Sequence, residues 1–286
     1  MQTQSMSRRG FLKASAIVGA AAVGATMSRD LMAAEDYGGH EIPVGLQLYT
    51  VGRDMSKDLD ATIEKVAKIG YKGVEFAGYY GKSAKDLRKL LDANGLKCCG
   101  THVPGGMLAL DADNFQKTVD FAKEIGCPNL IVASMRAEGK QGWEKAAEHF
   151  NHLSDKLEPM GLRIGYHCHP PDFKKVDGET TWDIFCSNTK KQVITQCDIG
   201  HMGTAGVDPV MYLNKYPGRA LSVHVKPSSR VKHGELLGED ELNWPAIFKA
   251  CETVGGTQWY IVEYDGGSME KAEKTMGVLR KWGKVV

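Results

Sequence analysis

Apolar and polar positions follow one repeating pattern from about Pro43 to Val286. A short apolar run is followed by a turn and then by a segment with apolar residues every three or four positions; these are the patterns of a buried strand and an amphipathic helix. The apolar runs predict strands at 44–51, 71–76, 96–103, 129–134, 163–169, 193–199, 220–226 and 259–264. The periodic segments predict helices over 58–69, 83–91, 112–125, 143–157, 182–187, 209–214, 244–254 and 269–282.

Eight strand–helix units within about 250 residues are typical of an α/β fold with a single (β/α)8 TIM barrel. An open, doubly wound sheet shares the alternation of strands and helices. However, no G-x-G-x-x-G motif follows the first predicted strand, and no glycine-rich phosphate loop occurs elsewhere in the chain. We therefore expect one barrel domain.

The predicted strand at 163–169 reads R-I-G-Y-H-C-H and carries two histidines. Side chains alternate along a strand, so His167 and His169 are expected on one face, at the strand's C-terminal end. Pro170 and Pro171 would end the strand, because proline cannot donate to a sheet hydrogen bond. One such histidine alone would suggest a core position. Two together indicate a metal-ligand or proton-transfer role, for which imidazole is well suited at neutral pH.

Polar residues also stand at the C-terminal ends of other predicted strands, where the functional side chains of TIM barrels gather. They are Glu75, His102, Asp198 with His201 just beyond it, His224, Lys226 and Glu263. Burying a carboxylate or imidazole is costly unless it is paired or binds a cation. Asp198, His224, Glu263 and one of the two histidines of 163–169 would together hold a divalent metal. This mixture of ligands suits Mn²⁺, Zn²⁺, Co²⁺ or Fe²⁺ better than Ca²⁺.

Two further side chains are candidates for the pocket, and Lys226 has two possible roles there. Gln47 and Tyr49 share the inward face of the first predicted strand, where they could line the pocket or serve the core. Lys226, two residues after His224, could neutralise an oxyanion or pair with a carboxylate.

The N-terminal segment has the pattern of an export signal. Residues 7–13 read S-R-R-G-F-L-K, which is typical of the twin-arginine signal of bacteria. The small-residue apolar run 14–27 that follows is too short and too rich in Ala and Gly for a membrane span. We expect residues 1–34 to be a signal peptide cleaved around Ala33 or Ala34, and residues 35–286 to form a periplasmic barrel that is not inserted in a membrane.

Charge and cysteine content narrow the function further. The chain has 36 basic and 35 acidic residues; removing residues 1–34 takes away four basic residues and one acidic residue and leaves 32 and 34. This balance disfavours nucleic-acid binding, which needs a basic surface. The seven cysteines form neither zinc-type C-x-x-C pairs nor a recognisable disulfide framework, so most are expected to be small buried apolar residues.

Six runs in this order resemble one known group of proteins: G-L-Q-L-Y-T-V (45–51), G-Y-K-G-V-E-F-A-G-Y-Y-G (70–81), G-Y-H-C-H (165–169), A-G-V-D-P-V-M-Y-L-N-K-Y-P-G-R (205–219), H-V-K-P (224–227) and I-V-E-Y-D (261–265). The chain is similar to the sugar phosphate isomerase/epimerase group of the xylose-isomerase-like TIM-barrel superfamily. The resemblance implies a metal held by His167, Asp198, His224 and Glu263. The resemblance also implies a difference: the epimerases of the group have a glutamate where this chain has His167. In those enzymes this glutamate and a second glutamate, which corresponds to Glu263, form the acid/base pair.

The resemblance implies a metal-dependent sugar isomerase or epimerase that removes a proton next to a carbonyl group. Glu263, His167 or His169 would take the proton, Lys226 would assist, and substrate hydroxyls would be oriented by residues that include Glu75, His102, His201, Gln47 and Tyr49. A sugar or keto-sugar is the expected small-molecule partner, and a homo-oligomer is compatible with the sequence.

Three alternatives remain at this stage. The same site in a lyase would cleave 3-keto-glycosides by β-elimination, an outcome that suits a periplasmic location and the lack of a phosphate loop. A non-catalytic periplasmic sugar-binding barrel would need no acid/base pair. An endonuclease IV-like role shares the superfamily, but the charge balance and the export signal argue against it.

Overall fold

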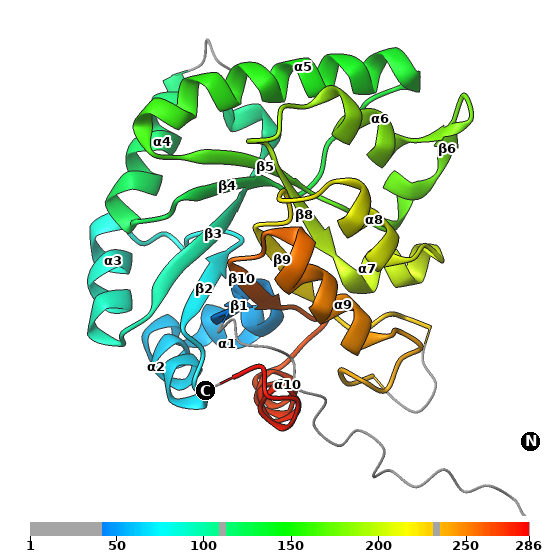
Figure 1. Cartoon of the computed structure of the whole chain (residues 1–286). Coiled ribbons are helices and arrows are strands. Elements are labelled where there is room, and N and C mark those ends of the chain that lie inside the picture. Colours follow the sequence, from blue (N-terminus) through cyan, green and yellow to red (C-terminus); the bar gives the residue numbers. More distant parts are fainter. Residues whose placement is uncertain (1–41, 109–112, 231–234, 286) are drawn as a thin grey trace, which may run out of the picture. The chain divides into compact units, whose positions relative to one another are not determined.

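The computed structural model describes residues 42–108, 113–230 and 235–285. Within these residues, eight parallel strands close into a barrel whose neighbours follow the order β1-β10-β9-β8-β5-β4-β3-β2 (Figure 1). The strands are β1 (Val44–Gln47), β2 (Gly73–Phe76), β3 (Lys97–Val103), β4 (Asn129–Val132), β5 (Arg163–His167), β8 (Ile194–Asp198), β9 (Ser222–Val225) and β10 (Trp259–Val262). The predicted (β/α)8 barrel is confirmed. The predicted signal peptide, residues 1–34, lies outside the described residues.

Helices surround the barrel and cover the outer face of its strands (Figure 1). They are α1 (Gly52–Lys57), α2 (Leu59–Ile69), α3 (Ala84–Ala93), α4 (Asp113–Ile125), α5 (Gly139–Leu157), α6 (Thr181–Asn188), α7 (Ile199–Ala205), α8 (Pro209–Lys215), α9 (Trp244–Ala250) and α10 (Met269–Lys281). The sequence pattern predicts neither α1 nor α7, nor the small antiparallel hairpin of β6 (Lys175–Val176) and β7 (Glu179–Thr180). None of the described helices is both long enough and apolar enough to cross a lipid bilayer.

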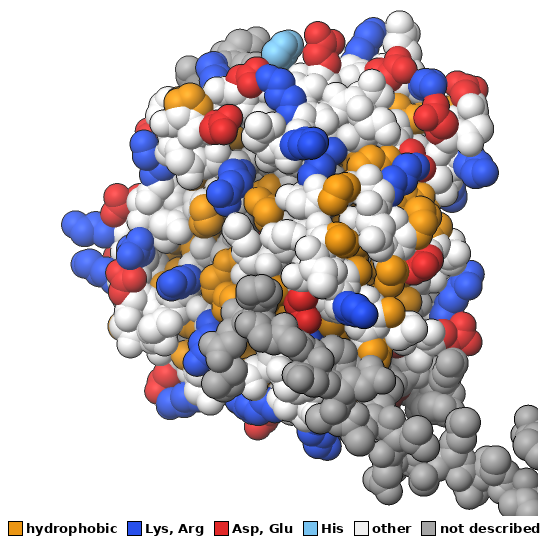
Figure 2. All heavy atoms as spheres, viewed as in Figure 1, with side chains coloured by type: hydrophobic (Ala, Val, Ile, Leu, Met, Phe, Trp, Pro, Cys, Tyr) orange, Lys and Arg blue, Asp and Glu red, His pale blue; other side chains and the backbone are white. Residues whose placement is uncertain are grey.

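The core lies between the strands and the helices. All residues of β1, β2, β4, β8 and β9 are buried, as expected for parallel strands covered on both faces. Between β5 and the helices α5 and α6, Phe150, Tyr166 and Phe185 pack with ring centroids 4.9–6.3 Å apart. All seven cysteines are buried, as expected for most of them, and all are free in this structure. Lys and Arg mix with Asp and Glu on the face shown in Figure 2, where no single-sign patch dominates.

Six of the eight predicted strands end one to four residues earlier than the pattern suggests, and two of these early ends change the environment of a candidate residue. β5 stops at His167, and the chain then turns through a 3-10 helix, Pro170–Phe173, so His169 does not share a strand face with His167. β1 stops at Gln47 and passes into another 3-10 helix, where Tyr49 is 56% exposed instead of inward-facing. Apolar runs do not show such turns, because 3-10 residues can be as buried as strand residues.

Asp172 holds the turn after β5. One oxygen of its buried carboxyl accepts the backbone N–H of His169 (2.7 Å), and the other accepts the hydroxyl of Tyr166 (3.0 Å). These two bonds fix the direction in which the chain leaves β5. As a result, the His169 ring lies 4.7 Å from that of His201 and 4.8 Å from that of His167, measured between ring centroids.

The carboxyl of Asp172 should make stability depend on pH. Burial raises its pKa from the ordinary value of 3.8 to about 6. The folded protein therefore holds this proton more tightly than the unfolded chain does, so the contribution is greatest below about pH 4 and is lost as the pH rises through about 6. A shift of this size corresponds to about 3 kcal/mol in the free energy of unfolding. Asp172→Asn has no carboxyl to titrate at this position. In this variant, the decrease in the free energy of unfolding between about pH 4 and pH 6 should be absent from urea unfolding curves.

Asp177→Asn is the matched control for this experiment, because Asp177 is an exposed aspartate in the neighbouring β6–β7 turn. It should keep the wild-type pH dependence. An Asp172→Asn protein with the wild-type slope would contradict the assignment.

Candidate functional site

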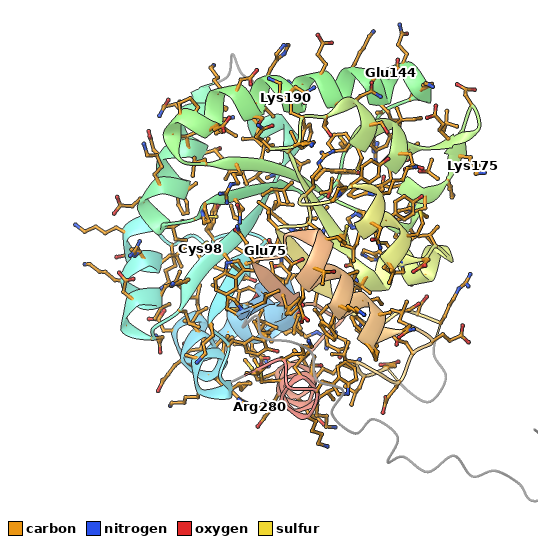
Figure 3. All side chains as sticks on the ribbon, in the orientation of Figure 1. Glu75, Cys98, Glu144, Lys175, Lys190 and Arg280 are labelled. Atoms are coloured by element: carbon orange, nitrogen blue, oxygen red, sulfur yellow. The ribbon has the colours of Figure 1, made fainter. Side chains whose placement is uncertain are left out.

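Charged side chains from four strand ends meet inside the barrel. Glu75 on β2, Asp198 on β8, His224 on β9 and Glu263 just after β10 are each at most 5% exposed. The strand register explains part of this convergence, because Asp198 pairs with His224 across β8 and β9. Figure 3 shows Glu75 near the centre of the barrel, whereas Glu144 and Lys175 lie at the periphery. Such burial requires each charge to find a partner.

His224 is held between two carboxylates. Its Nδ1 lies 2.7 Å from Oε2 of Glu263, and its Nε2 lies 2.7 Å from Oε2 of Glu75. Burial alone would lower the pKa of His224, but the charges of Glu75 and Glu263 outweigh it and raise the pKa to about 10. The ring is therefore an imidazolium at neutral pH, and each N–H donates to one carboxylate.

Glu75 lies below the mouth of the barrel and is fully buried. It accepts hydrogen bonds from Nε2 of Gln47 (2.9 Å), Nε2 of Gln196 (2.9 Å) and the ring of His224, and Nε2 of His102 lies 3.1 Å away. Burial would raise the pKa of Glu75, but His102 and His224 outweigh this effect and hold it well below its usual range. In this structure, Glu75 and Gln47 contact other side chains beneath the mouth, although both were predicted to contact substrate.

Lys226 has all three of its N–H donors engaged. Its Nζ lies 3.0 Å from Oε1 of Glu263, 2.8 Å from Oδ2 of Asp265 and 3.1 Å from Nε2 of His201. Burial would lower the pKa of Lys226, but the charges of Asp198 and Glu263 raise it above its usual range. An ammonium group offers three donors. Lys226 is therefore a fixed counter-charge at the mouth of the barrel.

Asp198 is the carboxylate whose charge is least matched. Its Oδ1 accepts the backbone N–H of His201 (2.8 Å) and so begins helix α7. Its Oδ2 is buried and finds no hydrogen-bond donor among the residues that the structure describes. Three basic side-chain nitrogens lie within 4 Å of it: Nε2 of His201 at 3.6 Å, Nε2 of His167 at 3.7 Å and Nζ of Lys226 at 3.8 Å. Burial accordingly raises the pKa of Asp198.

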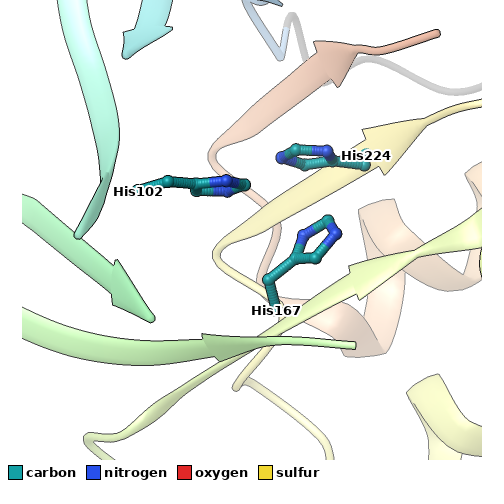
Figure 4. Close-up of side chains that lie close together, drawn as sticks. All are labelled: His102, His167 and His224. Atoms are coloured by element: carbon teal, nitrogen blue, oxygen red, sulfur yellow. The ribbon is translucent and has the colours of Figure 1, made fainter. Parts of the chain in front are cut away.

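The described His, Asp and Glu side chains form three groups whose potential ligand atoms lie within 4.8 Å of one another. The first is His102, His167 and His224, whose rings point toward one another from β3, β5 and β9 (Figure 4). The second is His167, His169 and His201. The third is His167, Asp198, His201 and Glu263, and it alone includes carboxylates.

The third group has the dimensions of a divalent-cation site. Two ligands about 2.1 Å from one tetrahedral zinc ion lie about 3.4 Å apart. The distances of 3.6 and 3.7 Å from Oδ2 of Asp198 to the nitrogens of His201 and His167 are close to this value. The chemistry also fits, because an unpartnered carboxylate oxygen faces two imidazole nitrogens. His167, Asp198 and Glu263 belong to the ligand set predicted from the sequence; here His201 accompanies them, whereas His224 is turned toward Glu75 and Glu263.

Local structure explains the position of His201. The capping bond from Asp198 starts α7 immediately after β8, so a residue three positions later turns back toward the carboxylate. Helix α7 also packs closely on the segment after β9. A Cβ at Gly200 would lie 2.6 Å from the carbonyl oxygen of Pro227, so this position requires glycine. The alternation of side chains along a strand cannot predict the direction of His201, because this residue lies in the first turn of helix α7.

A model of the xylose isomerase-like TIM barrel family matches residues 63–282. The chain belongs to this family. This finding agrees with the group of proteins that the sequence motifs resemble.

Curated proteins and solved structures similar to this xylose isomerase-like barrel include an isomerase, an epimerase and a dehydratase by name. The inosose dehydratase of Lacticaseibacillus casei is 24% identical over 243 residues, which cover 71% of this chain and 81% of the relative. The 2-oxo-tetronate isomerase of Haemophilus influenzae is 25% identical over 226 residues, which cover 70% of this chain and 85% of the relative. The crystal structure of a sugar phosphate isomerase/epimerase from Parabacteroides distasonis matches with a TM-score of 0.77 and 25% identity, over 87% of this chain and 97% of that chain.

Sequence reasoning missed one buried member of the site, Gln196. It lies on β8 two residues before Asp198 and contacts Glu75, His102 and His167. The parity that selected Asp198 also points Gln196 inward, so the signal was present in the sequence. An amide two residues before a carboxylate is simply less conspicuous than a charged group.

The unmatched oxygen of Asp198 leads to a prediction about stability. In chelator-treated protein, Asp198→Asn should raise the free energy of unfolding by about 1–3 kcal/mol, because an amide N–H replaces a buried acceptor without a donor. The same variant should lose the rise in melting temperature that Zn²⁺ or Mn²⁺ gives the wild type. Both changes can be measured by thermal and urea unfolding with and without the ion.

Asp265→Asn is the control, because this carboxylate stands at the same mouth but its side chain is 65% exposed. Its effect on stability should stay below about 1 kcal/mol. The interpretation fails if metal-free Asp198→Asn is less stable than the wild type, or if it is still stabilised by the ion.

Proposed function

We propose that this protein is a divalent-metal-dependent enzyme that removes a proton from the carbon next to the carbonyl group of a sugar or keto-sugar. Isomerisation or epimerisation is the outcome that we favour. The observation that carries the proposal is the buried Oδ2 of Asp198, which faces two imidazole nitrogens at 3.6–3.7 Å without a hydrogen bond. Such a set of acceptors is stable around a cation, and it lies at the strand ends where barrel enzymes act.

His167, Asp198, His201 and Glu263 would hold the cation, and Nε2 of His201 would then give up its contact with Nζ of Lys226. When bound, the cation would supply Lewis-acid chemistry, polarising the substrate carbonyl and stabilising the negative charge that develops on its oxygen. The residues around it hold this arrangement in place: His224 and Lys226 each bond Glu263, and Lys226 also bonds Asp265. The identity of the metal is left among Mn²⁺, Zn²⁺, Co²⁺ and Fe²⁺.

We assign the proton transfer to His169. Of the three candidate bases from the sequence, Glu263 already accepts from His224 and Lys226, and His167 bonds Gln196 through Nδ1. The ring of His169 is half-buried at the mouth, beside that of His201. Burial, with a smaller effect from His201, lowers the pKa of His169 to about 4, so its ring is neutral at pH 7.

A lyase is the second candidate, and the names of the relatives favour it. The relatives include an inosose dehydratase as well as a 2-oxo-tetronate isomerase at almost equal identity. Elimination and isomerisation can share one first step, removal of a proton next to a carbonyl. Reprotonation of the resulting carbanion gives an isomer or epimer, whereas expulsion of a β-substituent gives an alkene product. A 3-keto-glycoside would then release its aglycone.

Proton exchange tests the assignment directly. Metal-loaded wild-type protein, screened by NMR in D₂O against keto-sugars and 3-keto-glycosides, should introduce deuterium next to the carbonyl, and chelation should stop the exchange. His169→Asn should lower the exchange rate about 10²–10⁴-fold, the usual contribution of a general base. An isomer in the product mixture identifies the isomerase, and a free aglycone identifies the lyase.

His152→Asn is the matched control, because His152 is exposed on α5. It should exchange at the wild-type rate. Full exchange in His169→Asn would assign the base to another group. Substrate binding without any exchange in the wild type would instead favour a non-catalytic sugar-binding barrel.

We also propose that the protein works in the periplasm after twin-arginine export. The support is the sequence S-R-R-G-F-L-K at residues 7–13, followed by the apolar run and the Ala33-Ala34 site. A periplasmic location would favour keto-glycosides over sugar phosphates as substrates.

Export predicts where the chain is found in a bacterial cell with a twin-arginine pathway. The wild type should appear in the periplasmic fraction in a shortened form, and the double variant Arg8→Lys/Arg9→Lys should stay in the cytoplasm at full length. Arg29→Lys, which leaves the motif intact, should behave like the wild type. Cytoplasmic wild-type protein, or export of the double variant, would contradict the proposal.

A further inference from the structure

The side-chain amide of Gln196 is held in one orientation. It is fully buried, and its Nε2 lies 2.9 Å from Oε1 of Glu75 and 2.8 Å from Oγ of Ser222. An ionised carboxylate can only accept hydrogen bonds, so the amide atom that faces Glu75 must be the NH₂ group. A flipped amide would place two acceptors against each other in the interior, where an unsatisfied polar contact costs about 1–3 kcal/mol.

This orientation directs the amide oxygen toward two histidines. Oε1 of Gln196 lies 2.8 Å from Nδ1 of His167 and 3.0 Å from Nε2 of His102. A carbonyl oxygen can only accept, so both of these ring nitrogens must carry a proton. His167 is 1% exposed, so water has almost no access to replace this contact.

The proton on Nδ1 decides what His167 offers on its other side. A neutral imidazole has one N–H, so Nε2 of His167 carries a lone pair. That nitrogen lies 3.7 Å from Oδ2 of Asp198, which is itself an acceptor without a donor. Two acceptors thus face each other at the proposed cation position, and neither can bond the other.

We infer that Gln196 is a positioning residue that fixes His167 in its Nδ1–H tautomer and so presents the Nε2 lone pair to the cation. The inference rests on the proposed metal-dependent function. The chain of contacts begins at Glu75, passes through the amide of Gln196 and ends at His167. Histidine ligands of metals generally donate their other ring N–H to a neighbouring acceptor, and here a glutamine oxygen is that acceptor.

The tautomer can be read without metal or substrate. In chelator-treated, ¹⁵N-histidine-labelled full-length protein at neutral pH, long-range ¹H–¹⁵N spectra should show a protonated Nδ1 and an unprotonated Nε2 for His167, with the signal assigned by its loss in His167→Gln. In Gln196→Met, the ring loses its acceptor and should shift toward the Nε2–H tautomer, which can donate to Asp198. Its affinity for Zn²⁺, measured by calorimetry, should fall about 10–100-fold.

Ser222→Ala is the matched control, because it removes the second partner of the same amide nitrogen and leaves its bond to Glu75. It should retain both the Nδ1–H tautomer and the wild-type affinity for Zn²⁺. The wild-type spectrum alone can overturn the inference, so the test does not depend on whether Gln196→Met folds.

Two failures are distinguishable in this experiment. An Nε2–H ring in the wild type, or an unchanged tautomer in folded Gln196→Met, overturns the role of Gln196. A wild type that shows the Nδ1–H tautomer but binds no divalent ion overturns the proposed function instead.

Discussion

The burial of Asp198 is the constraint on which the candidate site depends. A carboxylate inside a barrel must be matched by donors or by a positive charge, and the protein matches the others with its own groups. Glu75 and Glu263 share the imidazolium of His224, and Glu263 also receives Lys226. Only one oxygen of Asp198 is satisfied, by the first turn of α7. The unmatched oxygen marks the place where a cation would lower the free energy of the folded chain.

The barrel stabilises this arrangement because the side chains that hold the site lie inside the strands, whereas the candidate ligands lie at the open mouth. Glu75, Gln196 and Ser222 form a fully bonded polar layer inside the strands, with Gln196 joining the other two. Above that layer, the strand ends carry Asp198, His224 and Glu263, and the turns that follow add His169 and His201. A satisfied polar layer in a low-dielectric interior holds its side chains in one geometry. The candidate ligands above it are therefore positioned before any cation arrives.

Most of the fold was predictable from short apolar runs that alternate with helical periodicity, and much of the site was predictable from the alternation of side chains along each strand. Strand parity placed Asp198, His224 and Glu263 together at one end of the barrel, and the eight apolar runs gave the correct number of barrel strands. Parity failed where the backbone leaves the strand. His201 follows a helical turn that starts at Asp198, and Tyr49 follows a 3-10 turn after β1. Strand parity also points Gln196 inward, but its uncharged amide gave no reason to choose it as a site residue. The N-terminal export signal lies outside the described residues and is still a prediction.

The resemblance to the epimerases implies a glutamate at the position of His167, and this difference bears on the proposed chemistry. The resemblance implies that in the epimerases this glutamate both binds metal and moves a proton. His167 cannot easily do both, because Nδ1 is engaged with Gln196 and Nε2 faces Asp198. Under the proposed function, proton transfer would then pass to a different group, and the turn held by Asp172 brings His169 to the same mouth.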